Sequence, residues 1–164
     1  RRTSTGLWVL PGGAPGQPHL ARDVTRALSR LFAVCVTDCG HGMDSPATVE
    51  VLSEAHAVAV VTPATPDGVR STCAALDRVA GADRAASLSR VVIALNTTSP
   101  DGRSALNTRA VHEALQRYDV PVVTVPHDRH LAAAAPVSAD RLGEATMVEA
   151  TRLAGHLLAR ARQL

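Results

Sequence analysis

The polar residues best suited to chemistry in this chain follow short apolar runs. Asp38 comes directly after the run Phe32–Thr37, Asn96 ends a later run, and Asp128 follows a third. In parallel α/β sheets, ligands bind outside the carboxyl ends of the strands. If these runs are strands, the three residues lie where a binding site is expected.

Asp38 and Gly40 form an Asp-x-Gly sequence. A carboxylate at the end of a buried strand suits Mg²⁺ held through water, and glycine lets the backbone approach a phosphate closely. The same pattern is that of an aspartate that caps the next loop. The placement suits a metal-binding role for Asp38, and the loop cap stays open as the alternative.

The two later strand ends carry groups that could bind a base. The amide of Asn96 both donates and accepts, so it could read a purine edge, although asparagine equally serves as a turn residue. Pro126 fixes the backbone as it leaves the sheet. Asp128 and His130 either contact a ligand or cap the short helix that follows them.

Histidine and cysteine are poorly spaced for a metal or a nucleophile. His127 and His130 form His-x-x-His, which is not the i, i+4 pair of a helical zinc site. Cys35 lies inside an apolar run and is expected to be a core residue. Cys39 and His41 are two residues apart and do not form an evident nucleophile–base pair.

Composition narrows the class of protein. The 164 residues are 46% apolar with a formal net charge of +2, which predicts one folded domain over residues 1–164 and gives no signal for nucleic acid. All 17 Lys and Arg positions are arginine, so a Schiff-base, general-base or phosphate-binding lysine is excluded. The three cysteines form no disulfide framework, and no apolar run suits a membrane span or a signal peptide. We therefore expect a cytoplasmic protein, with membrane contact not indicated. Since the chain does not begin with Met, we expect a trimmed piece of a longer protein.

Apolar runs alternate with amphipathic segments, which predicts an α/β fold: a three-layer sandwich with a mostly parallel sheet. The expected strands are Gly6–Leu10, Phe32–Thr37, Ala57–Thr62, Arg90–Leu95 and Val120–Val125. The expected helices are His19–Leu31, Ala47–Glu54, Asp67–Val79, Ser104–Arg117 and Ala145–Arg162. Ser45 before Pro46 is typical of a helix start, and Pro66-Asp67-Gly68 is expected to open another helix.

Taken in order, the strand-end segments resemble the MinD/ParA family of deviant Walker ATPases across nearly the whole chain. Leu7–Gly12 resembles the family's strand followed by Pro-Gly, and Ala55–Asp67 the strand and helix entry after switch II. Phe32–Gly40 resembles the strand that ends in the Walker B aspartate. Val92–Asn96 resembles the strand whose final Asn contacts adenine, and Val122–Asp128 the Val-Pro-x-Asp loop.

The resemblance implies a P-loop NTPase-like (SIMIBI) fold, incomplete at its N-terminal side, and an ATP-dependent switch that positions or regulates a larger assembly. Its cofactors would be ATP and Mg²⁺, and a homodimer is implied. Asp38 would be catalytic and hold Mg²⁺ through water, and Gly40 would face the γ-phosphate. Asn96, Pro126 and Asp128 would line the adenine.

The chain departs from the family in its phosphate cradle. The family's Gly-Lys-Gly-Gly-x-Gly-Lys-Thr loop cannot exist without lysine, and Thr97 stands where an arginine is usual. The chain thus resembles the C-terminal two-thirds of such an ATPase and is not expected to hydrolyse ATP alone. The alternative function is a nucleotide-free interaction module on the same scaffold. A receiver-like domain with Asp38 as phospho-acceptor is disfavoured because receivers need a lysine.

The resemblance also has a structural consequence. In the family the P-loop strand lies in the middle of the parallel sheet, and without it two apolar strand edges would lose their partner. We expect the chain to be rearranged, oligomeric through an exposed edge, or completed by another segment.

Overall fold

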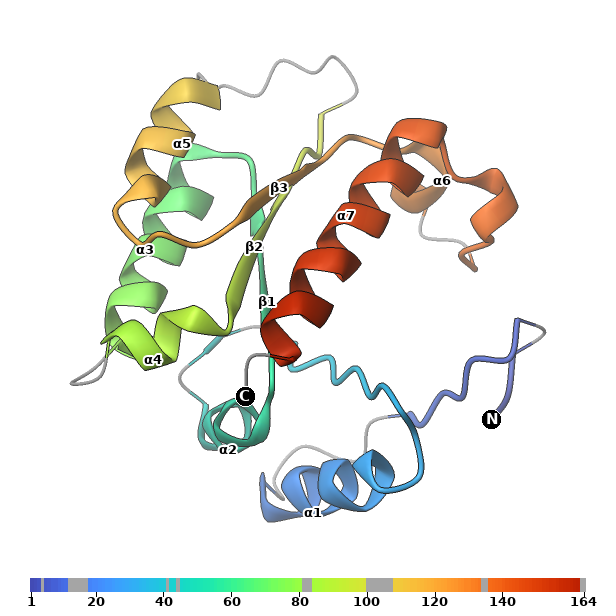
Figure 1. Ribbon diagram of the computed structural model, residues 1–164. Coiled ribbons are helices and arrows are strands. Elements are labelled where there is room, and N and C mark those ends of the chain that lie inside the picture. The colour runs from blue at the N-terminus through green and yellow to red at the C-terminus, as the bar shows by residue number, and fades with distance from the viewer. Residues whose placement is uncertain are drawn as a thin grey trace. The chain divides into compact units, whose positions relative to one another are not determined.

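The computed structural model describes residues 1–3, 5–11, 18–40, 42–43, 45–80, 84–99, 108–133 and 136–162. By its internal contacts the chain divides into two compact units, Arg1–Ala55 and His56–Leu164. Among the residues described, the first unit has two helices, and the second has a parallel sheet with its covering helices (Figure 1).

The second unit is built on three parallel strands in the order β1 (Val58–Pro63), β2 (Val91–Asn96) and β3 (Val122–Val125). The first five side chains of β2 are buried, and only Asn96 at its end is exposed. A nearly continuous apolar run is what a strand covered on both faces requires. The expected α/β class with a parallel sheet is therefore confirmed in this unit.

Helices lie on both faces of this sheet. Helices α3 (Pro66–Ala80) and α5 (Thr108–Gln116) contact each other on one face, and α7 (Glu144–Ala161) packs on β2 and β3 from the other (Figure 1). Three short helices complete the unit: α4 (Arg84–Ser89), α6 (Arg129–Ala132) and the 3₁₀ helix η1 (Ala139–Arg141). Parallel strands need such helical crossovers, because the chain must return to the same end of the sheet.

The core of this unit is built mainly of aliphatic side chains from the sheet and from α3 and α5, and Leu88 and Tyr118 are buried as well. Leu76 on α3 and Leu115 on α5 are fully buried, as is Ile93 in the central strand. Burying each such side chain stabilises the fold by about 1.5–3 kcal/mol relative to leaving it exposed. The scarcity of aromatic residues is thus compensated by closely spaced Leu, Ile, Val and Ala.

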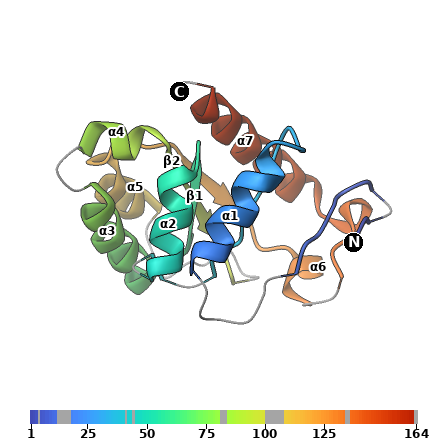
Figure 2. The same ribbon diagram turned by 90° about the horizontal axis from the view of Figure 1, so that it is seen from below.

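In the first unit, α1 (Pro18–Ser29) contacts α2 (Pro46–Glu54), and the two are seen side by side in Figure 2. Ser45 caps α2, because its side chain accepts a hydrogen bond from the Thr48 amide at 3.1 Å. This confirms the helix start predicted at Ser45-Pro46.

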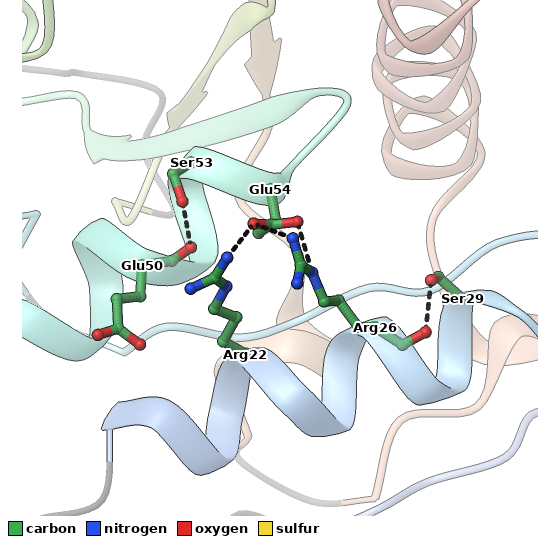
Figure 3. Close-up of polar contacts among 6 residues, drawn as sticks. All are labelled: Arg22, Arg26, Ser29, Glu50, Ser53 and Glu54. Atoms are coloured by element: carbon green, nitrogen blue, oxygen red, sulfur yellow. Dashed lines mark hydrogen bonds and ion pairs between the residues drawn. The ribbon is translucent and has the colours of Figure 1, made fainter.

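A carboxylate joins the two helices of the first unit. Arg26 donates from two nitrogens to the two oxygens of Glu54, both at 2.9 Å, and Arg22 lies 3.0 Å from Oε1 (Figure 3). These contacts, led by the hydrogen bond from Arg26, lower the pKa of Glu54. The two arginines lie one helical turn apart and so present the same face to α2.

Replacing Glu54 with glutamine is expected to loosen the contact between α1 and α2. The change removes the charge but keeps the shape, so hydrogen exchange of the α1 amides should quicken roughly two- to fivefold at low salt. The difference should shrink in about 1 M NaCl, where exposed charges are screened. Asp23→Asn, which removes an exposed negative charge from α1, is the matched control. Equal exchange in the Glu54→Gln variant and the parent would show that the ion pairs do not hold the helices together.

Three predicted strands and five predicted helices are confirmed to within a few residues. The strands over Ala57–Thr62, Arg90–Leu95 and Val120–Val125 are β1, β2 and β3. The helices are α1, α2, α3, α5 and α7, although the start of the predicted range Ser104–Arg117 lies outside the described residues. The helix expected to open at Pro66-Asp67-Gly68 begins at Pro66.

Two predicted strands are wrong. In the described part of the chain, Gly6–Leu10 contributes one isolated antiparallel bridge, between Arg2 and Trp8. Phe32–Thr37 pairs with no described strand, and Val36 is 91% exposed. An apolar, β-branched run favours a strand, but a strand also needs a neighbouring backbone to pair with, and in the described part of the chain this run has none.

Among the residues that the structure describes, no helix combines the length and the apolar character needed to cross a membrane.

Candidate functional site

The carboxyl ends of β2 and β3 lie next to each other. Asn96, the last residue of β2, is opposite Val125, the last residue of β3. The Thr97 amide then donates to the Val125 carbonyl at 2.9 Å, which continues the pairing past the ends of both strands. The exposed Asn96 and the half-buried Pro126 therefore lie at the same edge of the sheet.

Asp128 holds the chain that leaves this edge. Its Oδ1 accepts from the amides of His130 at 2.8 Å and Leu131 at 3.3 Å, which makes Asp128 the N-cap of α6. Its Oδ2 accepts from the Gly143 amide at 2.8 Å, fifteen residues further along the chain. One buried carboxylate thus closes the segment between β3 and the start of α7.

The electrostatics follow from these bonds. Hydrogen bonds lower the pKa of Asp128 to about 2. The largest contribution comes from the Gly143 amide, and smaller ones come from Thr146 and the amides of the capped helix. Hydrogen bonds to a charged form favour that form, so the carboxylate stays ionised well into acid.

His130 fixes the middle of the same segment. Its ring is buried, and Nε2 accepts a hydrogen bond from the Ser138 amide at 2.9 Å. The Ser138 hydroxyl donates in turn to Asp140 on η1, which lowers the pKa of Asp140. The side chains of Asp128 and His130 therefore accept hydrogen bonds from backbone amides of the segment that they hold.

The outer surface of this loop is partly apolar. Leu131 is 41% exposed and Val137 is 64% exposed, and the side chain of Arg129 also faces solvent. We call residues 129–133 and 136–142 the held loop. An ordered loop with apolar side chains turned outward is suited to protein recognition, because little entropy is lost when it binds.

The other two predicted site residues, Asp38 and Gly40, belong to the first unit. The Gly40 amide donates to Asp38 Oδ1 at 2.9 Å, and Gly40 has φ +67°, a conformation that favours glycine. This is the geometry of a loop cap. Burial, and then the charge of Asp38, raise the pKa of the Cys39 thiol, which disfavours a thiolate there. His41 lies outside the described residues.

The structure thus brings Asn96, Pro126 and Asp128 to one edge of a sheet and places Asp38 and Gly40 in the other unit. Their assignment to ATP and Mg²⁺ stays a prediction. Among the described residues, no group of three or more His, Cys, Asp or Glu side chains is arranged to hold a metal ion.

The role of Gly143 and Ser138 was not predicted from the sequence. The Asp128 cap has a local signal, an aspartate directly before a short helix. Gly143 lies fifteen residues beyond Asp128, so only the fold brings its amide to the carboxylate.

Comparison with known proteins finds a relative of different function from the one expected. The chain is 32% identical over 115 residues to the ESX-1 secretion-associated protein EspI of Mycobacterium tuberculosis, in both the CDC 1551 and the H37Rv strains. The match covers 70% of this chain and 17% of the length of EspI. No protein-family model and no solved structure matches the chain.

These comparisons correct the resemblance to the MinD/ParA ATPases, which is wrong. The relatives found are named for secretion, so the ATP-dependent switch and the description as an ATP-binding hydrolase of that type are wrong as well. The motifs behind the resemblance are short, and capping of loops and helices by Asp38 and Asp128 accounts for two of them. Such residues recur wherever a buried strand ends.

Proposed function

We propose that this chain acts in protein secretion, as a protein-binding domain that contacts its partner through the held loop. The observation that carries the proposal is the 32% identity to EspI, named as an ESX-1 secretion-associated protein, over 70% of the chain. Because the match spans 17% of that relative, the proposal concerns the part of it that resembles this chain.

The form of the held loop supports a binding role. Asp128, His130 and Gly143 fix the loop from inside, so its backbone is ordered before any partner arrives. The side chains of Leu131, Val137 and Arg129 are exposed on this loop, so it offers apolar groups and positive charge to a partner. Fixing a loop in advance removes an ordering cost that binding would otherwise have to offset.

The test is made in the organism that encodes the chain, in the full-length gene. We expect an in-frame deletion of the segment to lower the amount of one or more secreted proteins in the culture medium at least fivefold. Leu131→Arg with Val137→Arg should have the same effect, because two charges on the apolar surface oppose its burial. Quantitative mass spectrometry of medium and cell lysate measures both.

The matched control is Val148→Arg, which places the same charge on an exposed position of α7. This strain should secrete as the parent does. An unchanged set of secreted proteins in the deletion strain would overturn the role in secretion. Loss in the deletion strain with normal secretion by the Leu131/Val137 variant would keep that role and remove the loop from it.

A further inference from the structure

The hydrogen bond between His130 and Ser138 can exist only with a neutral imidazole ring. Nε2 of His130 accepts from the Ser138 amide at 2.9 Å, and a backbone amide can only donate. A protonated imidazole carries a hydrogen on both nitrogens and has no acceptor left. The ring that holds Ser138 therefore has its single N–H on Nδ1 and a free lone pair on Nε2.

The surroundings of the ring do not prevent it from taking up a proton. His130 is buried, which disfavours its charged form, but two carboxylates act in the opposite direction. Asp140 on η1 interacts electrostatically with His130, and Asp128 accepts a hydrogen bond from the His130 amide. The other titratable side chains on these segments are the half-buried His127 and the exposed Arg129, Arg141 and Glu144, and β3 carries none. The Ser138 hydrogen bond and burial are thus what favour the neutral ring.

The two side chains that fix the held loop respond to acid in different pH ranges. The pKa of Asp128 is about 2, so its carboxylate keeps its bonds to the start of α6 and to Gly143 above about pH 5. A histidine in water takes up a proton near about pH 6.5. Between about pH 7.5 and 5.5, His130 is therefore the one of the two whose charge can change.

We propose that His130 makes the held loop sensitive to pH. A proton on Nε2 removes the acceptor of the Ser138 amide, and the side of the loop that carries Val137 is released while Asp128 keeps its own end closed. The open loop binds one proton more than the held loop, so falling pH favours the open form. A weaker contact with the partner in mild acid would be the consequence. This consequence rests on the proposed function, whereas the opening itself does not.

The experiment measures hydrogen exchange of the Ser138 amide by NMR, without any partner, and compares it with the intrinsic exchange rate at each pH. Uptake of one histidine proton on opening multiplies the opening constant by about ten between pH 7.5 and 5.5, so the protection of Ser138 should fall about tenfold. The amides of Ile93 in β2 and of Gly143 should keep their protection, because their acceptors, Pro121 and Asp128, do not change charge in this range.

Two variants separate His130 from its neighbour. His130→Gln offers an amide oxygen as acceptor and does not titrate, so the protection of Ser138 should change by less than about twofold over the same range. His127→Gln removes the half-buried histidine that accepts no hydrogen bond from Ser138, and this variant should show the tenfold fall of the parent. An equal fall in the His130→Gln variant overturns the proposal, and so does its absence in the His127→Gln variant.

A measurement on the parent alone decides the matter if glutamine does not hold the loop. The nitrogen chemical shifts of the His130 ring report its protonation directly and should change with the same midpoint as the protection of Ser138. A ring that stays neutral down to about pH 5.5 overturns the proposal. So does a ring that is protonated while Ser138 keeps its protection, and so does a simultaneous loss of protection at Ile93, which would be unfolding of the whole unit.

Discussion

Gly68→Ala is expected to destabilise the second unit by about 2–3 kcal/mol. Gly68 lies in the first turn of α3, where the helix passes over the end of β1. A Cβ at this position would lie 2.5 Å from the carbonyl oxygen of Pro63 and 2.7 Å from its Cγ. Pro63 is held in the sheet opposite Asn96, so the backbone it would collide with cannot move aside without disturbing the pairing.

Gly155→Ala provides the matched control. A Cβ added at Gly155, inside α7, meets no atom within 4 Å. Alanine in an exposed helix is favoured over glycine by about 0.5–1 kcal/mol, so this variant should be as stable as the parent or more stable. Urea unfolding followed by circular dichroism measures both. Equal stability of the two alanine variants would show that α3 does not approach β1 as closely as the structure has it.

Asp128→Ala is also expected to destabilise the second unit strongly and to lower its melting temperature by about 5 °C or more. The change leaves the amides of His130, Leu131 and Gly143 without their acceptor. The start of α6 and the closing of the held loop are lost together. Differential scanning calorimetry measures the loss, and exchange of the Gly143 amide should quicken in the variant.

The stabilisation from Asp128 depends on pH in a defined direction. Its pKa is about 2 in the folded chain, below the roughly 3.9 of an unfolded aspartate. The carboxylate therefore contributes its full stability above about pH 5, and this contribution is lost as the pH falls from 5 toward 2.

Asp128→Asn tests this dependence. The difference in unfolding free energy between the parent and this variant should be largest near neutral pH and should diminish steadily below pH 5. Asp23→Asn, at an exposed position of α1, is the matched control. A difference for Asp128 that stays constant down to pH 2 would show that its charge is not what the loop amides bind.

The elements of the second unit could be predicted from the sequence because each has a local cause. The run Val91–Leu95 is apolar throughout, as a strand covered on both faces must be. Pro66 begins α3, where the missing amide costs nothing. In the first unit, the Ser45 cap follows from the same local rules.

The errors arise where the outcome depends on distant residues. Phe32–Thr37 has the composition of a strand, and only the positions of other strands decide whether it pairs. The sequence predicts that Asp128 contacts a ligand or caps a helix. The cap is observed, and its second partner, Gly143, is one that no local pattern connects to Asp128. The structure shows the cap, and the assignment of the strand-end residues to a nucleotide stays a prediction.

The role in secretion is tested most directly by asking whether the folded second unit, and not merely the presence of the polypeptide, is needed. Gly68→Ala and Gly155→Ala are introduced into the full-length gene, and secreted proteins are quantified in the medium of each strain. We predict that the Gly68→Ala strain loses the same secreted proteins as the deletion strain, whereas the Gly155→Ala strain secretes as the parent does. Normal secretion by the Gly68→Ala and deletion strains alike would contradict the account.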